Sequence, residues 1–307
     1  MMMRLFYTFL LIVVAFTPSR AQKSNISLNI EKGKTYSHNT SSTVTIIQDL
    51  NGMEMEMEMG MSGTLDYLVM GMEGENYKLE ARYKNVSMSM NMPQGSMSYN
   101  SEKKDEEDIL STMLGEMINK PFVIIMKKNG QIKEIRDIDV LYNSMFKKFP
   151  QIPEAQIEQL KLQLMKTYGE EAFRGNIEMV TSVFPDKEVA VGDTWSKTTI
   201  LKSTMSASIK STFELKNITD TYYVIEGAST IDTIDKDTYV ESNGLLMKFD
   251  LQGTMKSTIK VDRKTGWIIE SEISQDFGGN AAVKPNEQLP DGMLIPMDIE
   301  SVTKITN

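Results

Sequence analysis

Residues 53–61 read MEMEMEMGM, and residues 88–92 follow with MSMNM. Successive side chains of a β-strand point to opposite faces, so the methionines of the first segment form one row and its glutamates form the other. One face of this strand is therefore soft and apolar, and the opposite face is acidic. The pattern predicts two strands that share a methionine surface, made of Met53, Met55, Met57, Met59, Met61, Met88, Met90 and Met92.

Strand patterns dominate the rest of the chain. Residues 43–48 (TVTIIQ) are rich in β-branched side chains, residues 77–83 (YKLEARY) alternate, and an Asn-Gly turn at 129–130 joins two short apolar runs. Helical spacing is confined to residues 109–117, 141–149 and 152–173. We therefore expect a β-dominated α+β fold, in which an antiparallel curved sheet or partial β-barrel carries inserted helices.

The second half of the chain repeats the order of elements in the first. KGKTY (32–36) and VGDTW (191–195) each open a Ser/Thr-rich strand, and residues 221–227 correspond to the strand that begins at Tyr77. The hairpin at 259–271 corresponds to the Asn-Gly hairpin. These matches predict a duplicated sheet with an N-terminal β-rich half (22–137), a helical insert (138–175) and a C-terminal β-rich half (176–307), the two halves forming one compact unit.

Residues 1–21 have the features of a signal peptide. Arg4 precedes about a dozen apolar residues, too few for the roughly 20 that span a bilayer, and SRA (19–21) is a small-residue cleavage site. The chain has no cysteine, which excludes disulfides, thiolate sites and a lipoprotein anchor. We expect an exported protein, periplasmic or secreted, that is soluble and has no integral membrane span. Its formal net charge of −9 argues against nucleic acid as a partner.

The methionine rows are the main candidate binding site. Methionine is an adaptable apolar residue, common on surfaces that accept varied apolar molecules, so the rows could line a cavity whose two ends are closed by Tyr36 and Trp195. Thioethers are also soft ligands for Cu(I), which makes Met55, Met57, Met88 and Met90 an alternative metal site. A third interpretation is compositional drift in a low-complexity segment.

Catalytic motifs are absent from the sequence. His38 is the only histidine, no Gly-x-Ser-x-Gly motif occurs, and we expect His38 to be an ordinary exposed residue at a strand start. Acidic residues alternate at 235–241, but the glycine of a calcium-binding EF-hand loop is missing, which favours a solvated turn. A two-carboxylate hydrolase stays open, although no pair of acids is singled out. We expect no catalytic residues and no cofactor.

Two segments carry a resemblance to a known family: VGDTW at 191–195, preceded by Phe184 and Pro185, and the Thr-Gly hairpin that ends in Trp267. With these segments the chain resembles a family of uncharacterised Bacteroidetes envelope proteins, domain of unknown function 6263. The resemblance extends from about Lys32 to Ile305. It implies a signal peptide and β-rich repeats, and it brings no catalytic residues. The methionine rows are not part of that family pattern.

Three functions follow as hypotheses from these features. The first is non-enzymatic binding of an apolar or lipid-like molecule in a curved-sheet cavity. The second is periplasmic Cu(I) binding through the methionine strands. The third is a cell-envelope adaptor that receives a strand of a partner protein at an exposed sheet edge.

Overall fold

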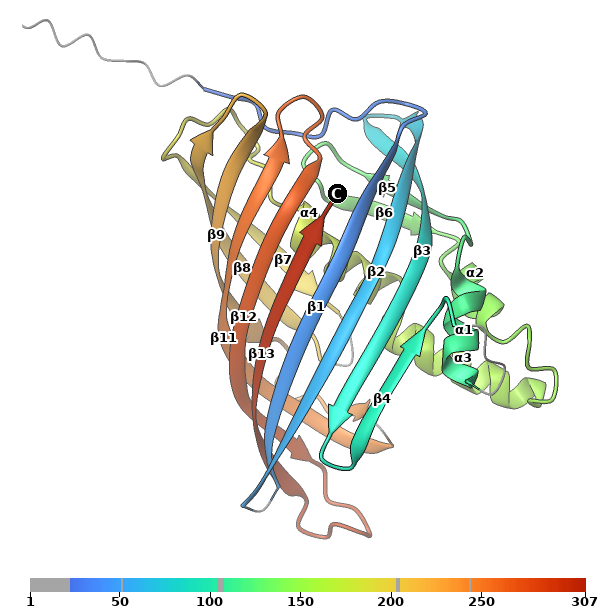
Figure 1. Cartoon of the computed structure of the whole chain (residues 1–307). Helices are drawn as coiled ribbons and strands as arrows, with labels where there is room; N and C mark the ends of the chain where they lie inside the picture. Colours follow the sequence, from blue (N-terminus) through green and yellow to red (C-terminus); the bar gives the residue numbers. More distant parts are fainter. Residues whose placement is uncertain (1–22, 51, 104–107, 203–204, 243) are drawn as a thin grey trace, which may run out of the picture.

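The computed structural model describes residues 23–50, 52–103, 108–202, 205–242 and 244–307 (Figure 1). The predicted signal peptide lies outside these residues. The strands are β1 Thr35–Leu50, β2 Met53–Glu73, β3 Asn76–Met92, β4 Gly95–Asn100, β5 Phe122–Met126, β6 Ile132–Arg136, β7 Thr194–Leu201, β8 Ala207–Ile218, β9 Tyr222–Thr233, β10 Val240–Ser242, β11 Leu245–Asp262, β12 Ile268–Val283 and β13 Met293–Thr306. The helices are α1 Ile109–Met117, α2 Asp139–Met145, α3 Glu154–Tyr168 and α4 Glu170–Thr181.

All these strands belong to one antiparallel sheet. The order across it is β6-β5-β3-β2-β1-β13-β12-β11-β9-β8-β7, with β4 paired to β3 and β10 paired to β11. Two meanders, β1 to β6 and β7 to β13, therefore meet where the first strand pairs with the last, from Asn39 opposite Thr306 to Gln48 opposite Met297. The prediction of a β-dominated fold with a curved antiparallel sheet and inserted helices is confirmed, and the structure shows that the sheet is not closed into a barrel.

The two meanders begin alike. Gly33 (φ +80°) precedes β1 and Gly192 (φ +89°) precedes β7, so each glycine supplies a left-handed turn before a strand. The strands that begin near Tyr77 and Tyr222 are β3 and β9, each the third of its meander. Because β13 has no counterpart in the first meander, duplication of the sheet stays a prediction.

The segment from residue 23 to residue 34 crosses the upper end of the sheet (Figure 1). Its backbone N–H groups donate to Lys128 O of the β5–β6 hairpin and to Thr265 O of the β11–β12 hairpin, at 2.8 and 2.7 Å. Its apolar side chains, Ile26, Leu28 and Ile30, are buried in the main core. The segment thus ties the two meanders together and closes the upper end of the curved sheet.

Helix α4 lies between the two edge strands, behind the front strands in Figure 1. At β6, the Glu178 carboxylate accepts the N–H of Ile132 at 2.6 Å and the Arg174 guanidinium donates to the Lys133 carbonyl at 3.2 Å. At β7, Gly175 comes so close that an added Cβ would lie 2.9 Å from the carbonyl oxygen of Ile200. The helix therefore occupies the gap that a closed barrel would fill with strand pairing.

The helices differ from the expected ones at their boundaries. A single helix over residues 152–173 is wrong, because Gly169 has extended backbone angles and separates α3 from α4. In place of the helix expected over residues 141–149, the structure has the shorter helix α2, which begins at Asp139 and ends at Met145. Among the described residues, no helix is long and apolar enough to cross a membrane.

The docking of the N-terminal segment predicts different costs for two glycine substitutions. Gly74 and Gly266 have nearly the same φ, +63° and +65°, but a Cβ at Gly266 would lie 2.0 Å from the carbonyl oxygen of Ser27, whereas a Cβ at Gly74 meets nothing within 4 Å. Gly74→Ala should lower the free energy of unfolding by about 1 kcal/mol. Gly266→Ala should cost about 2 kcal/mol more, because the segment must move. Equal costs in chemical denaturation would contradict this account.

Candidate functional site

The methionines of β2 lie on the inner face of the sheet, the face that packs against the core. Leu65, Tyr67 and Val69 are buried on the same strand, and they share the odd-numbered positions with Met53 to Met61. The glutamates at 54, 56 and 58 occupy the opposite, outer face. The apolar methionine row therefore lies on the core side of the sheet. The charged glutamate row faces solvent, where its carboxylates stay hydrated.

A β-bulge brings the second methionine row to the same face. On β3 the buried residues Tyr77, Leu79 and Ala81 are odd-numbered, whereas the methionines at 88, 90 and 92 are even-numbered. The register with β2 shifts between these groups: Asn85 lies opposite Thr64, Tyr83 lies opposite Leu65, and Lys84 has no opposite residue. The extra residue reverses the alternation, so the core residues and the methionines of β3 both face inward.

The register then aligns methionines across three strands. Met61 lies opposite Met88, Met59 lies opposite Met90, and Met90 lies opposite Met97 on β4. On the other side of β2, Val44 and Ile46 of β1 lie opposite Met59 and Met57. We call this surface the methionine face; it consists of Val44, Ile46, Met55, Met57, Met59, Met61, Met88, Met90, Met92 and Met97.

The methionine face is not part of the packed core. Met61 is 45% exposed and Met97 is 41% exposed, and the other members are half-buried. Met53, at the lower end of β2, is 68% exposed. Ile46 also packs against a small second core of β11, β12 and β13, so the face continues into an apolar region of the second meander. Contiguous apolar side chains that stay partly open to solvent are a feature of binding sites.

A cavity of about 430 Å³ lies above the methionine face, between α4 and the sheet. Met61 and Met88 line its lower part, and Phe173, Ile177 and Met179 of α4 line its other side. Its remaining lining residues are His38, Thr40, Ser42, Ser62, Gly63, Leu65, Tyr67, Tyr83, Val86, Ser87, Leu114, Asn176, Val180, Thr181, Thr303 and Ile305. The size and the mainly apolar lining fit a small-molecule site.

His38 is buried, which corrects the expectation of an exposed residue. Only 6% of it is exposed, and its ring stacks on Trp267 with centroids 4.4 Å apart and meets Tyr67 edge-on at 5.5 Å. Its Nε2 lies 3.2 Å from the carbonyl oxygen of Ile268. Burial lowers the pKa of His38 from 6.5 to about 4, and the hydrogen bond to Ile268 opposes the shift only in part. The imidazole is therefore neutral at pH 7.

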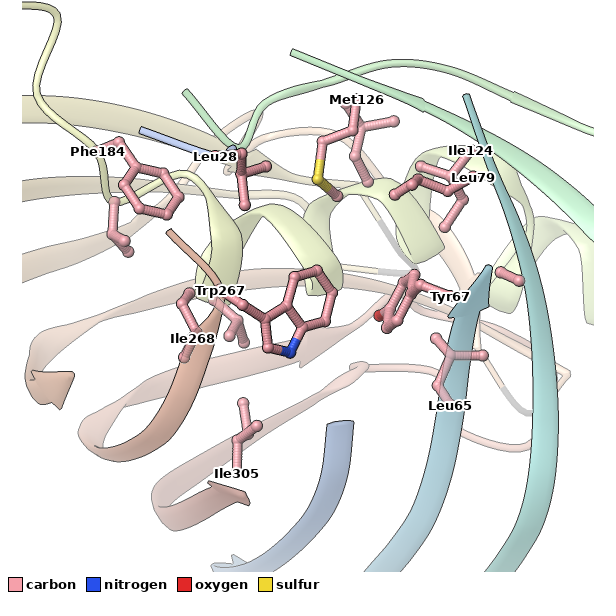
Figure 2. Packing of buried hydrophobic residues seen from close by; sticks show 14 of the residues in the cluster. Leu28, Leu65, Tyr67, Leu79, Ile124, Met126, Phe184, Trp267, Ile268 and Ile305 are labelled. Carbon is pink, nitrogen blue, oxygen red and sulfur yellow. The ribbon is translucent and has the colours of Figure 1, made fainter. Parts of the chain in front are cut away.

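Figure 2 shows the aromatic part of this arrangement, with Trp267 beside Tyr67 and with Ile268 and Ile305 nearby. Trp267 is 2% exposed and its indole N–H donates to the carbonyl oxygen of Ser37 at 3.2 Å. Burial raises the pKa of the Tyr67 phenol well above its usual range. The side chains between the core and the cavity are therefore aromatic and uncharged.

Tyr36 and Trp195 lie away from the cavity. The Tyr36 ring packs on Trp267 with centroids 5.1 Å apart, and the Trp195 indole N–H donates to the carbonyl oxygen of Val183 at 2.8 Å. Neither residue is part of the lining. Both pack against the main core near the start of a strand.

The four methionines proposed as Cu(I) ligands are not brought together as one group. Met88 and Met90 lie two residues apart on β3, but Met55 lies opposite Gln48 and is four residues from Met59, about 13 Å along an extended strand. The closest row across strands is Met59, Met90 and Met97. Among the described residues, no three His, Cys, Asp or Glu side chains form a group that could hold a metal.

Sequence reasoning missed the α4 side of the cavity and the polar positions on β1. Phe173 was visible only as the last residue of the helix expected over residues 152–173, and Asn176 and Ile177 lay beyond that helix, so nothing showed that they face a cavity. The alternating positions 38, 40 and 42 carry His, Thr and Ser, and this polar alternation just before the apolar positions 44 and 46 was the available signal.

The burial of His38 predicts a pH dependence of stability. Because the pKa of His38 in the folded protein lies below its unfolded value, its contribution is complete above pH 6.5 and is lost as the pH falls toward 4, by about 3 kcal/mol in total. His38→Phe should remove this loss, so the difference in unfolding free energy between variant and parent should change with pH in that interval. An imidazole NMR titration with a midpoint near 6.5 would contradict the buried, neutral ring.

Comparison with solved structures gives distant similarities. A chain described as "lipid-protein interactions in lipovitellin" aligns with 10% identity and a TM-score of 0.48 over 91% of this chain and 25% of that chain. The COG4313 outer membrane channel from Pseudomonas putida F1 aligns with 6% identity and a TM-score of 0.28 over 91% of this chain and 97% of that one. The chain thus spans a quarter of the lipovitellin chain, and both similarities are too low to indicate a shared fold.

The sequence comparison is more direct. No curated protein matches the chain. Residues 74–268, more than half of the chain, match the model of a family of unknown function, DUF6263. This segment runs from the β2–β3 turn through the four helices to the first residue of β12, and it contains the bulge at Lys84, the cavity side of α4 and Trp267. The chain belongs to the DUF6263 family.

Proposed function

We propose that this protein binds an apolar or lipid-like molecule without catalysing a reaction, after export through the signal peptide expected at residues 1–21. The observation that carries the proposal is the position of the cavity: Met61 and Met88 belong both to its lining and to the methionine face. A molecule in the cavity can therefore continue along an apolar surface that the protein leaves open.

The packing around the site supports binding more than a purely structural role. Methionines that only filled the core would be buried, as Met126 is at 1% exposure, but no member of the methionine face is. Flexible thioether side chains adapt to partners of different shape, which suits a site for acyl chains or other irregular apolar molecules. The outer glutamates keep the same strands hydrated on the opposite face.

At β6 and β7, the two ends of the main strand order, the sheet gives less support to an adaptor that receives a partner strand. At β6, the N–H of Ile132 already donates to Glu178 and the carbonyl of Lys133 accepts from Arg174. At β7, α4 lies within contact of Ile200 and Leu201. Side chains and backbone of α4 therefore occupy positions that strand addition would need.

Paired substitutions on the two faces of β2 and β3 test the proposal. Met59→Gln with Met90→Gln places polar amides in the methionine face and should raise the Kd of an apolar fluorescent probe such as Nile red about tenfold or more, since apolar contact is lost. The control, Glu54→Gln with Glu56→Gln, changes the outer face of the same sheet and should alter Kd less than about twofold. An equal effect of both pairs, or no effect of either, would rule out the methionine face as the binding surface.

One observation favours Cu(I) binding as a second candidate function: Met59, Met90 and Met97 lie in one row across β2, β3 and β4. Three thioethers on neighbouring strands can converge on a soft monovalent cation. Replacing all three by Leu keeps the apolar surface and removes the sulfur. If the protein handles copper, this variant should lose Cu(I) binding, measured by competition with a chromogenic Cu(I) chelator, while its uptake of Nile red stays unchanged. If the parent protein shows no Cu(I) binding, this candidate is excluded.

A further inference from the structure

The cavity under α4 has no charged side chain in its described lining. Lysine, arginine, aspartate and glutamate are all missing from it, although charged residues make up 24% of the chain. Its one titratable base, His38, is held neutral by burial against Trp267 and Tyr67. A charged ligand group in this cavity would therefore find no counter-charge there, which is costly; the cation of the adjoining hollow, Lys103, pairs with Asp108 at 2.9 Å.

Polar groups are nevertheless concentrated on one side of the cavity. His38, Thr40 and Ser42 are successive inner-face residues of β1, and Thr303 lies opposite Ser42 on β13. The Ser42 and Thr303 hydroxyls are 2.9 Å apart and hydrogen-bond to each other. From the other side, the exposed rim residue Asn176 of α4 reaches the same cavity.

Several of these groups have unused hydrogen-bonding capacity. The side chains of Thr40 and Asn176 and the phenol of Tyr67 make no hydrogen bond to another described residue. The Nε2 of His38 faces the carbonyl oxygen of Ile268, so Nε2 carries the proton and Nδ1 is left as an acceptor. A polar group of a ligand would therefore find neutral hydrogen-bond donors and acceptors here. The walls on either side of them are apolar.

Polarity also changes along β1. The inner positions read His38, Thr40, Ser42, then Val44 and Ile46, so the polar positions lie beside α4 and the apolar positions lie beside the methionines of β2. The site is therefore amphipathic along its length, with one polar end under the helix and one apolar end on the open sheet.

We infer that the ligand is an uncharged amphiphile, with a hydroxyl- or ester-bearing head group held by Thr40, Asn176 and the neighbouring polar side chains, and with its hydrocarbon chain lying over Met61 and Met88 onto the methionine face. This inference rests on the proposed function and names the ligand class. Fatty acids, phospholipids and cationic amphiphiles are disfavoured, because their head groups would lose hydration without gaining an ion pair.

A series of competitors with one chain length and different head groups tests the inference. Hexadecanol and glycerol monopalmitate are neutral, hexadecyl sulfate is a fixed anion, and hexadecyltrimethylammonium is a fixed cation. Each competitor is used below its own aggregation concentration, and its displacement of Nile red from the full-length mature protein is measured. Both neutral competitors should bind at least about tenfold more tightly than both ions. Equal or tighter binding of either ion overturns the inference while the apolar-binding function stands. Failure of the probe and of every competitor to bind overturns the proposed function itself.

Two substitutions at the rim give an independent readout. Asn176→Lys adds a cation beside the polar groups and should shift the preference toward hexadecyl sulfate, about tenfold relative to hexadecanol. The matched control Gln163→Lys adds the same charge on exposed α3, outside the cavity, and should leave the preference unchanged.

Asn176→Leu removes the polar contact without adding charge. It should raise the Kd of glycerol monopalmitate about fivefold. The Kd of Nile red should stay unchanged, which shows that the cavity is still folded. If binding persists in both Asn176 variants with the head-group preference of the parent, the assignment of the head group to this rim is wrong.

Discussion

The pairing of the first strand with the last is the constraint on which the rest of the structure depends. Ten consecutive residues of β1, from Asn39 to Gln48, lie opposite β13, and this ladder joins two meanders that would otherwise each end in an open edge. Contacts of such sequence separation close a large loop, at an entropic cost that local hairpins do not have. The N-terminal segment and the stack of His38 on Trp267 add to the same junction, and both connect residues more than 220 positions apart.

The junction also determines where a ligand site can form. It places the polar positions of β1 beside Thr303 of β13, and it places the apolar positions of β1 between the methionines of β2 and the inner residues of β13. Helix α4 then covers the upper part of this surface and fills the gap between β6 and β7. Three zones therefore follow one another along the same strands. They are a packed upper core, a half-covered polar zone and an open apolar zone.

The sequence contained much of the local structure. The Met-Glu alternation predicted a strand with one apolar and one acidic face, and the Asn-Gly turn at 129–130 predicted the β5–β6 hairpin; both were readable because each depends on neighbours in sequence. The sequence also predicted that Met88 to Met92 share a surface with the methionines of β2, but it did not show the bulge at Lys84, which puts this surface on the same face as the buried residues of β3. His38 was mistaken for an exposed residue because Trp267 and Ile268, which bury it, come some 230 residues later.

Native mass spectrometry of the protein purified from its native source, compared with the same sample after denaturation, tests the central claim most directly. The account predicts an additional organic mass of one neutral amphiphile per chain, which disappears on denaturation and is identified by fragmentation. A bound mass of copper, or a charged lipid as the retained molecule, would contradict it, and so would a chain that carries no additional mass before or after incubation with glycerol monopalmitate.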